Sequence, residues 1–253
     1  MSAIRLSYIQ AQELFFMHKL LLGVLLIASL LPTTVLYAAS LSAVSLAAQQ
    51  TVMTELAKLE KNNGKYIRSS KLQALKLIKD AIEKNPELAA SLTSFVISQG
   101  VGVSATVTTA CQAAAKSDQA AAITAAAIQA APPALAAAIT AAAISVSPKQ
   151  AAAITTAAIN AVLKQAPAIT SAAVTAAPLQ ANAITKAALK AAGSTEVRRL
   201  IAVAASNAGV PVQVINNELK NITNKNGVYE VFQKDTSNTV NSTMTMGSNS
   251  EPT

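Results

Sequence analysis

Isoleucine–threonine pairs recur along the chain at a nearly constant interval within long runs of alanine. In the middle of the sequence, the first residues of successive pairs are spaced by 16, 15, 15 and 15 positions; they are Ile123, Ile139, Ile154, Ile169 and Ile184. A second apolar residue follows each of them five positions later, and prolines precede several of them by six. A fixed period of this kind indicates a repeat architecture.

The repeat extends towards the N-terminus in weaker form. The pairs Leu92-Thr93 and Val107-Thr108 continue it, and Leu77-Ile78 is a more charged version. The sequence then divides into eight units, which are 71–85, 86–100, 101–116, 117–132, 133–147, 148–162, 163–177 and 178–192. When each unit is numbered from the first residue of its pair (position 0), Cys111 falls at position +4 and Gln112 interrupts the second apolar site.

Each unit predicts one short helix. Alanine is the strongest helix former, and proline suits the first helical position, where its missing N–H is not needed. Asn85 and Ser147 precede such prolines and are expected to cap their helices through their side chains. Pro167 stands late in its unit, so we expect the preceding helix to continue to Gln165 and the next to be shorter. Consecutive helices would run antiparallel, as 30-residue hairpins stacked into an all-α solenoid.

A helical projection separates a buried arc from a polar one. At 100° per residue, both isoleucines, the flanking alanines and the threonine fall on one broad arc, where the threonine hydroxyl can bond the carbonyl one turn back. This position argues against an exposed, ice-binding threonine array. Positions −5, +2 and +6 vary and lie opposite. In the units from 148 to 192, their polar members form the candidate interaction surface: Lys149, Thr156, Asn160, Lys164, Ser171, Thr175, Lys186 and Lys190.

The chain divides into four segments. Residues 1–40 contain a basic start, an apolar run and a small-residue end, which predict an upstream extension and a signal peptide that starts at Met17; an uncleaved membrane anchor is the alternative. Residues 41–70 are expected to form an N-terminal capping helix, and 71–208 the alanine-rich repeat domain, with Arg198 exposed at the start of its last helix. The polar segment 209–253 is expected to be mostly disordered, apart from a short helix after Pro211 and a strand or interaction peptide at GVYEVF.

The composition leaves little for catalysis. Aromatic residues make up 3% of 253 residues, and the chain has one histidine, His18, and one cysteine, Cys111. No disulfide, zinc spacing or concentrated carboxylate pair follows from this set, so we expect no catalytic residues, no cofactor and no metal. The formal net charge is +8, but the basic residues are not interleaved with aromatics as in a nucleic-acid surface. Attraction to anionic envelope components is consistent with this charge.

The pattern P-x-Q-A-A-A-I-T-x-A-A-I-x-A, mainly over residues 117–192, resembles the alanine-rich repeats of uncharacterised secreted proteins from proteobacteria. The resemblance implies an exported protein of the periplasm, cell surface or extracellular space, without an assigned enzymatic role and without site residues to carry over. Two functions remain open. One is a non-enzymatic scaffold that binds a protein or an envelope component, and the other is a structural protein that assembles end to end.

Overall fold

The computed structural model describes residues 46–47, 49–59, 61–62, 65–66, 68–223, 228–233 and 243–248. The expectations for residues 1–40, including the signal peptide, the Met17 start and the place of His18, lie outside these residues. The chain divides into a unit of residues 1–50, whose described residues are helical, and a unit of residues 51–253. Among the described residues, no helix is both long and apolar enough to cross a membrane.

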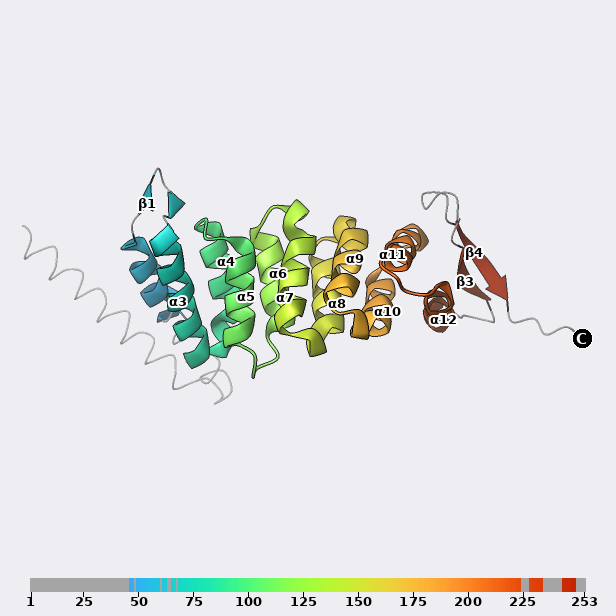
Figure 1. The fold of residues 1–253 in the computed structure, drawn as a ribbon, viewed down its shortest axis with the longest axis horizontal. Coiled ribbons are helices and arrows are strands. Elements are labelled where there is room, and N and C mark those ends of the chain that lie inside the picture. Colours follow the sequence, from blue (N-terminus) through green and yellow to red (C-terminus); the bar gives the residue numbers. More distant parts are fainter. Residues whose placement is uncertain are drawn as a thin grey trace, which may run out of the picture. The chain divides into compact units, whose positions relative to one another are not determined.

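The second unit consists largely of short helices in series (Figure 1). It begins with helical residues 51–57 and a small hairpin of β1 (Lys61–Asn62) and β2 (Lys65–Tyr66). The helices that follow are α3 (Arg68–Lys84), α4 (Ala89–Ser98), α5 (Val103–Ala113), α6 (Ala120–Ala130), α7 (Ala136–Val146), α8 (Ala151–Ala161), α9 (Ala166–Ala176), α10 (Ala181–Ala191), α11 (Thr195–Asn207) and α12 (Val212–Thr223). Strands β3 (Val228–Gln233) and β4 (Thr243–Ser248) complete the unit.

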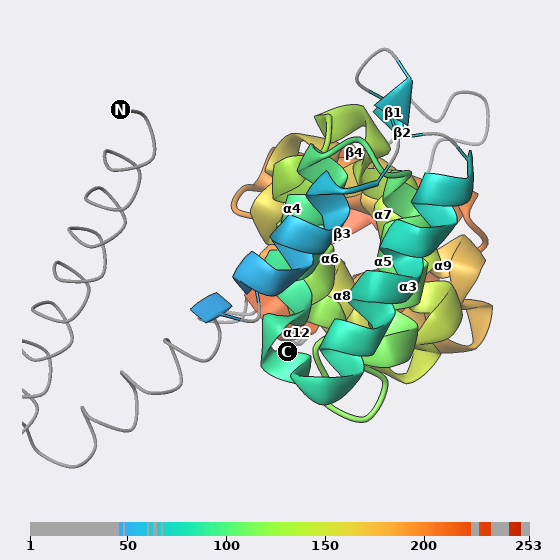
Figure 2. The same ribbon diagram turned by 90° about the vertical axis from the view of Figure 1, so that its left-hand side faces the viewer.

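The helices form two layers. Odd-numbered helices from α3 to α11 pack on one another in order, and even-numbered helices from α4 to α12 do the same. Consecutive helices run antiparallel and cross from one layer to the other, which Figure 2 shows along the stack. This arrangement confirms the predicted α-solenoid.

A tight turn starts most of the repeat helices. The 3₁₀ turns at Pro86–Leu88, Pro133–Leu135, Pro148–Gln150 and Pro178–Gln180 each begin at a recurring proline and lead directly into an α-helix. The prolines thus serve as first residues, as predicted. The predicted side-chain caps are wrong, since neither Asn85 nor Ser147 makes a cap hydrogen bond. The backbone hydrogen bonds of the 3₁₀ turn already satisfy some of the N–H groups at the start of the helix. A side-chain cap is therefore not required there.

The prediction for Pro167 is also wrong. Helix α8 ends at Ala161, Leu163–Gln165 forms the same 3₁₀ turn, and α9 keeps the 11-residue length of its neighbours. Pro167 is the second residue of α9, where no intrahelical N–H bond is lost. Leu163 therefore takes the place that proline occupies in other units, and the period is preserved.

Helices α4 and α6–α10 bury the arc that the sequence predicts, whereas α3 buries Ile78 in place of Leu77. In α8 the buried residues are Ala151, Ile154, Thr155, Ala158 and Ile159. The hydroxyl of Thr155 donates to the carbonyl of Ala151 at 2.7 Å. The same bond, 2.6–2.8 Å long, is formed by Thr93, Thr124, Thr140, Thr170 and Thr185. Buried hydroxyls need such a partner, and their burial excludes an exposed threonine face.

Helix α5 corrects the alignment of the third unit by one residue. Its buried residues include Thr106, Val107, Ala110 and Cys111, so Thr106 stands at position 0 and Cys111 at the second apolar site. Gln112 is then an ordinary exposed residue. Burial raises the pKa of the Cys111 thiol to about 12, which makes it a small core residue.

Two segments outside the repeats also differ from expectation. Residues 41–70 do not form a single helix, because β1 and β2 separate residues 51–57 from α3. Asn63-Gly64, between these strands in the sequence, is a strong hairpin signal. In the segment 209–253, α12 and β3 are the short helix and the strand expected there, and β4 is a further strand that was not expected. They fold because α11 and α12 supply the apolar surface that the tail lacks, with Ile215, Leu219 and Phe232 buried.

Candidate interaction surface

A groove between α8 and α10 brings half of the predicted surface residues together. Position +2 and position +6 of the two helices face it, contributing Thr156 and Asn160 from α8 and Lys186 and Lys190 from α10. Alanines of both helices, among them Ala153 and Ala187, line the rest of a space of about 630 Å³. The two helices are neighbours in one layer, so positions that are 30 residues apart in sequence lie side by side.

Among the described residues that line this groove, Lys186 and Lys190 are the only charged ones. They lie one helical turn apart on α10, where like charges repel weakly. Lys186 is 3.5 Å from a carboxylate oxygen of Glu218 in α12, which holds it at the side towards α12. Lys190 is exposed and, within the described part of the chain, has no ion-pair partner. Its charge is available to a ligand in the groove.

The surrounding sequence makes this part of the chain uniformly basic. From Gln119 to Ala192 the only charged residues are Lys149, Lys164, Lys186 and Lys190, with no carboxylate among them. The structure separates these four lysines. Lys149 and Lys164 stand in the turns before α8 and α9, and only Lys186 and Lys190 line the groove.

The predicted residues do not form one continuous surface. Ser171 and Thr175 lie on α9, which belongs to the other layer, and the hydroxyl of Thr175 bonds the carbonyl of Ser171 at 2.9 Å. Alternate helices turn their polar arcs in opposite directions, because each layer buries its apolar arc against the other. A one-helix projection cannot separate the two faces, and the eight residues therefore divide between them and the turns.

A second groove lies near the start of the unit and has mixed charge. Glu55 of the helical segment 51–57 and Lys58, which directly follows it, line this groove together with Lys76 and Asp80 of α3. Lys58 is already paired with Glu55 at 2.6 Å. Charges of both signs, largely exposed, are typical of a solvated surface and do not favour a ligand of either charge.

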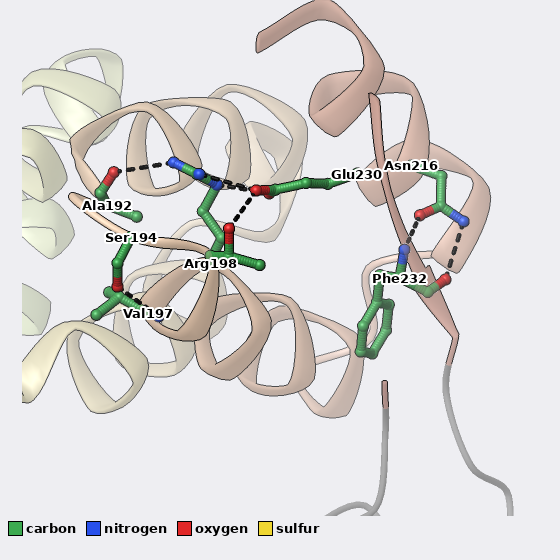
Figure 3. A network of polar contacts seen from close by, with 8 residues as sticks. Ala192, Ser194, Val197, Arg198, Asn216, Glu230 and Phe232 are labelled. Atoms are coloured by element: carbon green, nitrogen blue, oxygen red, sulfur yellow. Dashed lines mark hydrogen bonds and ion pairs between the residues drawn. The ribbon is translucent and has the colours of Figure 1, made fainter. Parts of the chain in front are cut away.

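A polar network at the other end of the unit was not predicted (Figure 3). Arg198 of α11 binds Glu230 of β3 at two points, with Nε to Oε2 at 2.6 Å and Nη2 to Oε1 at 2.9 Å. Thr195 donates to the same carboxylate at 2.6 Å, and Arg198 also reaches the carbonyl of Ala192 at 3.3 Å. Arg198 is thus largely buried, with 18% of its side chain exposed, where the sequence indicated an exposed residue.

Burial and hydrogen bonding act in opposite directions on Glu230. Burial disfavours its charged form, but the hydrogen bonds from Arg198 and Thr195, together with the guanidinium charge, hold its pKa below the ordinary value. Glu230 is therefore a carboxylate at neutral pH. No sequence signal pairs it with Arg198, because the two residues are 32 positions apart.

Asn216 of α12 binds backbone groups of the same strand, β3. Its carboxamide oxygen accepts the backbone N–H of Phe232 at 2.7 Å, and its Nδ2 donates to the Phe232 carbonyl at 3.1 Å. The side chain thus satisfies both backbone groups of one strand residue, as a neighbouring strand would. Together, Arg198 and Asn216 fix the β3–β4 hairpin on α11 and α12.

The described residues contain no group of three or more histidine, cysteine, aspartate or glutamate side chains that could hold a metal ion. Comparisons of the chain with protein-family models, with curated proteins and with solved structures found no match.

Proposed function

We propose that the protein is an exported, non-enzymatic helical-repeat scaffold whose α8–α10 groove binds an acidic segment of a partner protein. One observation carries the proposal: Lys186 and Lys190 project from one helix beside an alanine-lined groove, in a stretch of the chain that contains no carboxylate. Complementary charge speeds the association of the two proteins and disfavours partners whose charge has the same sign.

The groove suits an extended peptide better than a flat membrane surface. Its walls are short side chains, which allow the backbone of a ligand to approach the helices. Asn160 offers a donor and an acceptor at the rim, and the lysines meet carboxylates. A planar surface would contact exposed lysines in general, including Lys149 and Lys164, and would not depend on the two in the groove.

End-to-end assembly, the alternative function, has less support. It needs an open helix face at the ends of the stack. At the C-terminal end, β3 covers α12 and buries Phe232, and the Arg198–Glu230 pair holds it there. This end resembles the capping elements that limit repeat arrays.

The test is peptide binding measured by fluorescence anisotropy. The probe is a labelled glutamate-rich peptide of about a dozen residues, and the reference is the same peptide with glutamine in place of glutamate. We expect the acidic peptide to bind more tightly, and its affinity to fall with added salt. In the double variant K186Q/K190Q the affinity should fall about tenfold, which corresponds to about 1.4 kcal/mol.

The matched control is K149Q/K164Q, which makes the same change in net charge outside the groove. Its affinity should stay within about twofold of the unmodified chain, since long-range screening leaves only a small effect. Equal losses in both double variants would indicate nonspecific attraction to basic charge and would contradict the groove as the site. Equal affinity for the two peptides would contradict an acidic partner.

A further inference from the structure

Strand β4 forms the outer edge of the hairpin. Within the described part of the chain, the sheet consists of β3 and β4, paired antiparallel over six consecutive positions, from Val228 opposite Ser248 to Gln233 opposite Thr243. Helix α12 packs against β3. Among the described residues, no further strand pairs with β4.

The contact between Asn216 and Phe232 shows which backbone groups of β4 point outward. Antiparallel residues direct their N–H and C=O groups to alternate edges of a strand. Those of Phe232 are turned to Asn216, away from β4. Met244 is opposite Phe232, so its own groups point to the outer edge. The same alternation turns Met246 and Ser248 outward and Thr245 inward to β3.

This edge lacks the features by which soluble proteins prevent strand addition. Its sequence, Thr-Met-Thr-Met-Gly-Ser, contains no charged residue and no proline, and its register with β3 is not interrupted by a bulge. Met246 is 63% exposed. Lysine, proline and bulges are the usual protection of such edges, and a hydrophobic, uncharged edge without them is suited to accept another strand.

We propose that the chain dimerises through β4, in an antiparallel pairing of two β4 strands around a two-fold axis at Thr245. In this register Met244 of each copy lies opposite Met246 of the other, and their outward groups can form four backbone hydrogen bonds. Residues opposite each other share a face, so the four methionines pack together on one side. The result is a four-stranded sheet.

A second copy fits this edge better than an unrelated strand. The register pairs methionine with methionine and threonine with threonine, and it brings no charges into opposition. The contact is isologous, so it uses the β4 edge of both copies and closes at two chains. It differs from end-to-end assembly, which would continue indefinitely, and it does not depend on the α8–α10 groove.

A disulfide placed on the axis tests the register in the full chain. In the proposed dimer, Thr245 opposes its own copy in a non-hydrogen-bonded pair, about 4.5 Å apart between Cα atoms, which a disulfide can span. The variant T245C should convert to a covalent dimer under mild oxidation. The control is Q233C, an exposed position on β3 away from the edge. The native Cys111 is 1% exposed and does not compete.

Mass measured by light scattering over a range of concentrations tests the dimer itself. The unmodified chain should reach twice 25.9 kDa at about 100 µM, and M246K, which adds a charge at the edge, should raise the dimer dissociation constant at least about tenfold. The control Q233K adds the same charge on β3 and should leave it unchanged. A single-copy mass at all concentrations, open-ended growth, equal effects of the two lysine variants, or equal crosslinking of T245C and Q233C would each overturn the proposal.

Discussion

Arg198 in α11 and Glu230 in β3 form a two-point ion pair in which 18% and 5% of the side chains are exposed. The pair joins a strand from the polar end of the sequence to the last long helix of the repeat domain. Such a pair contributes geometry as well as energy, because the planar guanidinium accepts one orientation of the carboxylate. It explains how a segment with few apolar residues acquires a fixed position.

Removing one partner of this pair should release the hairpin. We expect E230A to lower the stability of the docked hairpin by about 3–5 kcal/mol, because Arg198 would keep a largely buried charge without its partner. Hydrogen exchange followed by mass spectrometry would show faster exchange in the peptide that covers 228–233. Helices α6–α9, which lie farther along the stack from the hairpin (Figure 1), should exchange as before.

The double variant R198M/E230L is the control for this first prediction. Replacing both charges with apolar side chains leaves no buried charge behind, so its exchange should be closer to that of the unmodified chain than to that of E230A. If E230A exchanged no faster than the unmodified chain, the pair would not hold the hairpin in place.

Acid should loosen the same contact in a narrow pH range. The pKa of Glu230 is lowered from its ordinary value of 4.5 in the folded protein, so ionisation contributes stability that is complete above about 4.5 and is lost as the pH falls through the folded-state pKa. Exchange in 228–233, corrected for intrinsic rates, should be constant from neutral pH to about pH 5 and should accelerate below pH 4.5. The variant E230Q should lack this acid step. Identical pH profiles for both proteins would show that another group controls docking.

The periodic core was predictable because the units that form α4 and α6–α10 obey the same geometric constraint. The isoleucines at positions 0 and +5 point in different directions and so contact different neighbouring helices. The alanines and the threonine then fall on the buried arc between these two side chains. Two departures from the repeat, one in a turn and one within a helix, were less predictable. Leu163 starts the same turn as the prolines, and Thr106 exchanges places with an apolar residue, because backbone geometry and not side-chain identity sets both positions.

The interaction surface was predictable only one helix at a time. The projection identified Asn160 and Lys190 as outward-facing, but whether two outward residues share a face depends on which helices are neighbours. Because successive helices alternate between the two layers, Asn160 and Lys190 line the same groove, whereas Thr175 lies in the other layer. The C-terminal network was not predictable at all, since Asn216 and Glu230 act through contacts made only after the hairpin has docked on α11 and α12.

The methyl group of the repeated threonine should matter more than its hydroxyl. The hydroxyl of Thr155 bonds the carbonyl of Ala151, which already accepts a backbone N–H in the helix, so T155V leaves no polar group without a partner and should change stability by less than about 1 kcal/mol. T155S keeps the hydroxyl but removes a buried methyl, and it should cost about 1 kcal/mol or more. Urea denaturation of both variants would measure the difference. A larger loss for T155V than for T155S would mean that the hydroxyl specifies the packing.

The buried alanines should tolerate no enlargement, because they set the distance between the helix layers. Ala143 of α7 is fully buried, with 0% exposed, and leucine there would force neighbouring helices apart or into strained rotamers. We expect A143L to lower the free energy of unfolding by about 1–3 kcal/mol or more. Ala138 lies on the exposed side of the same helix, so A138L makes the same chemical change without the clash and should be within about 0.5 kcal/mol of the unmodified chain. Thermal and urea unfolding followed by circular dichroism would compare the two. If A143L were as stable as A138L, the layers would be loosely packed, and the alanine content would need an explanation other than close approach of the helices.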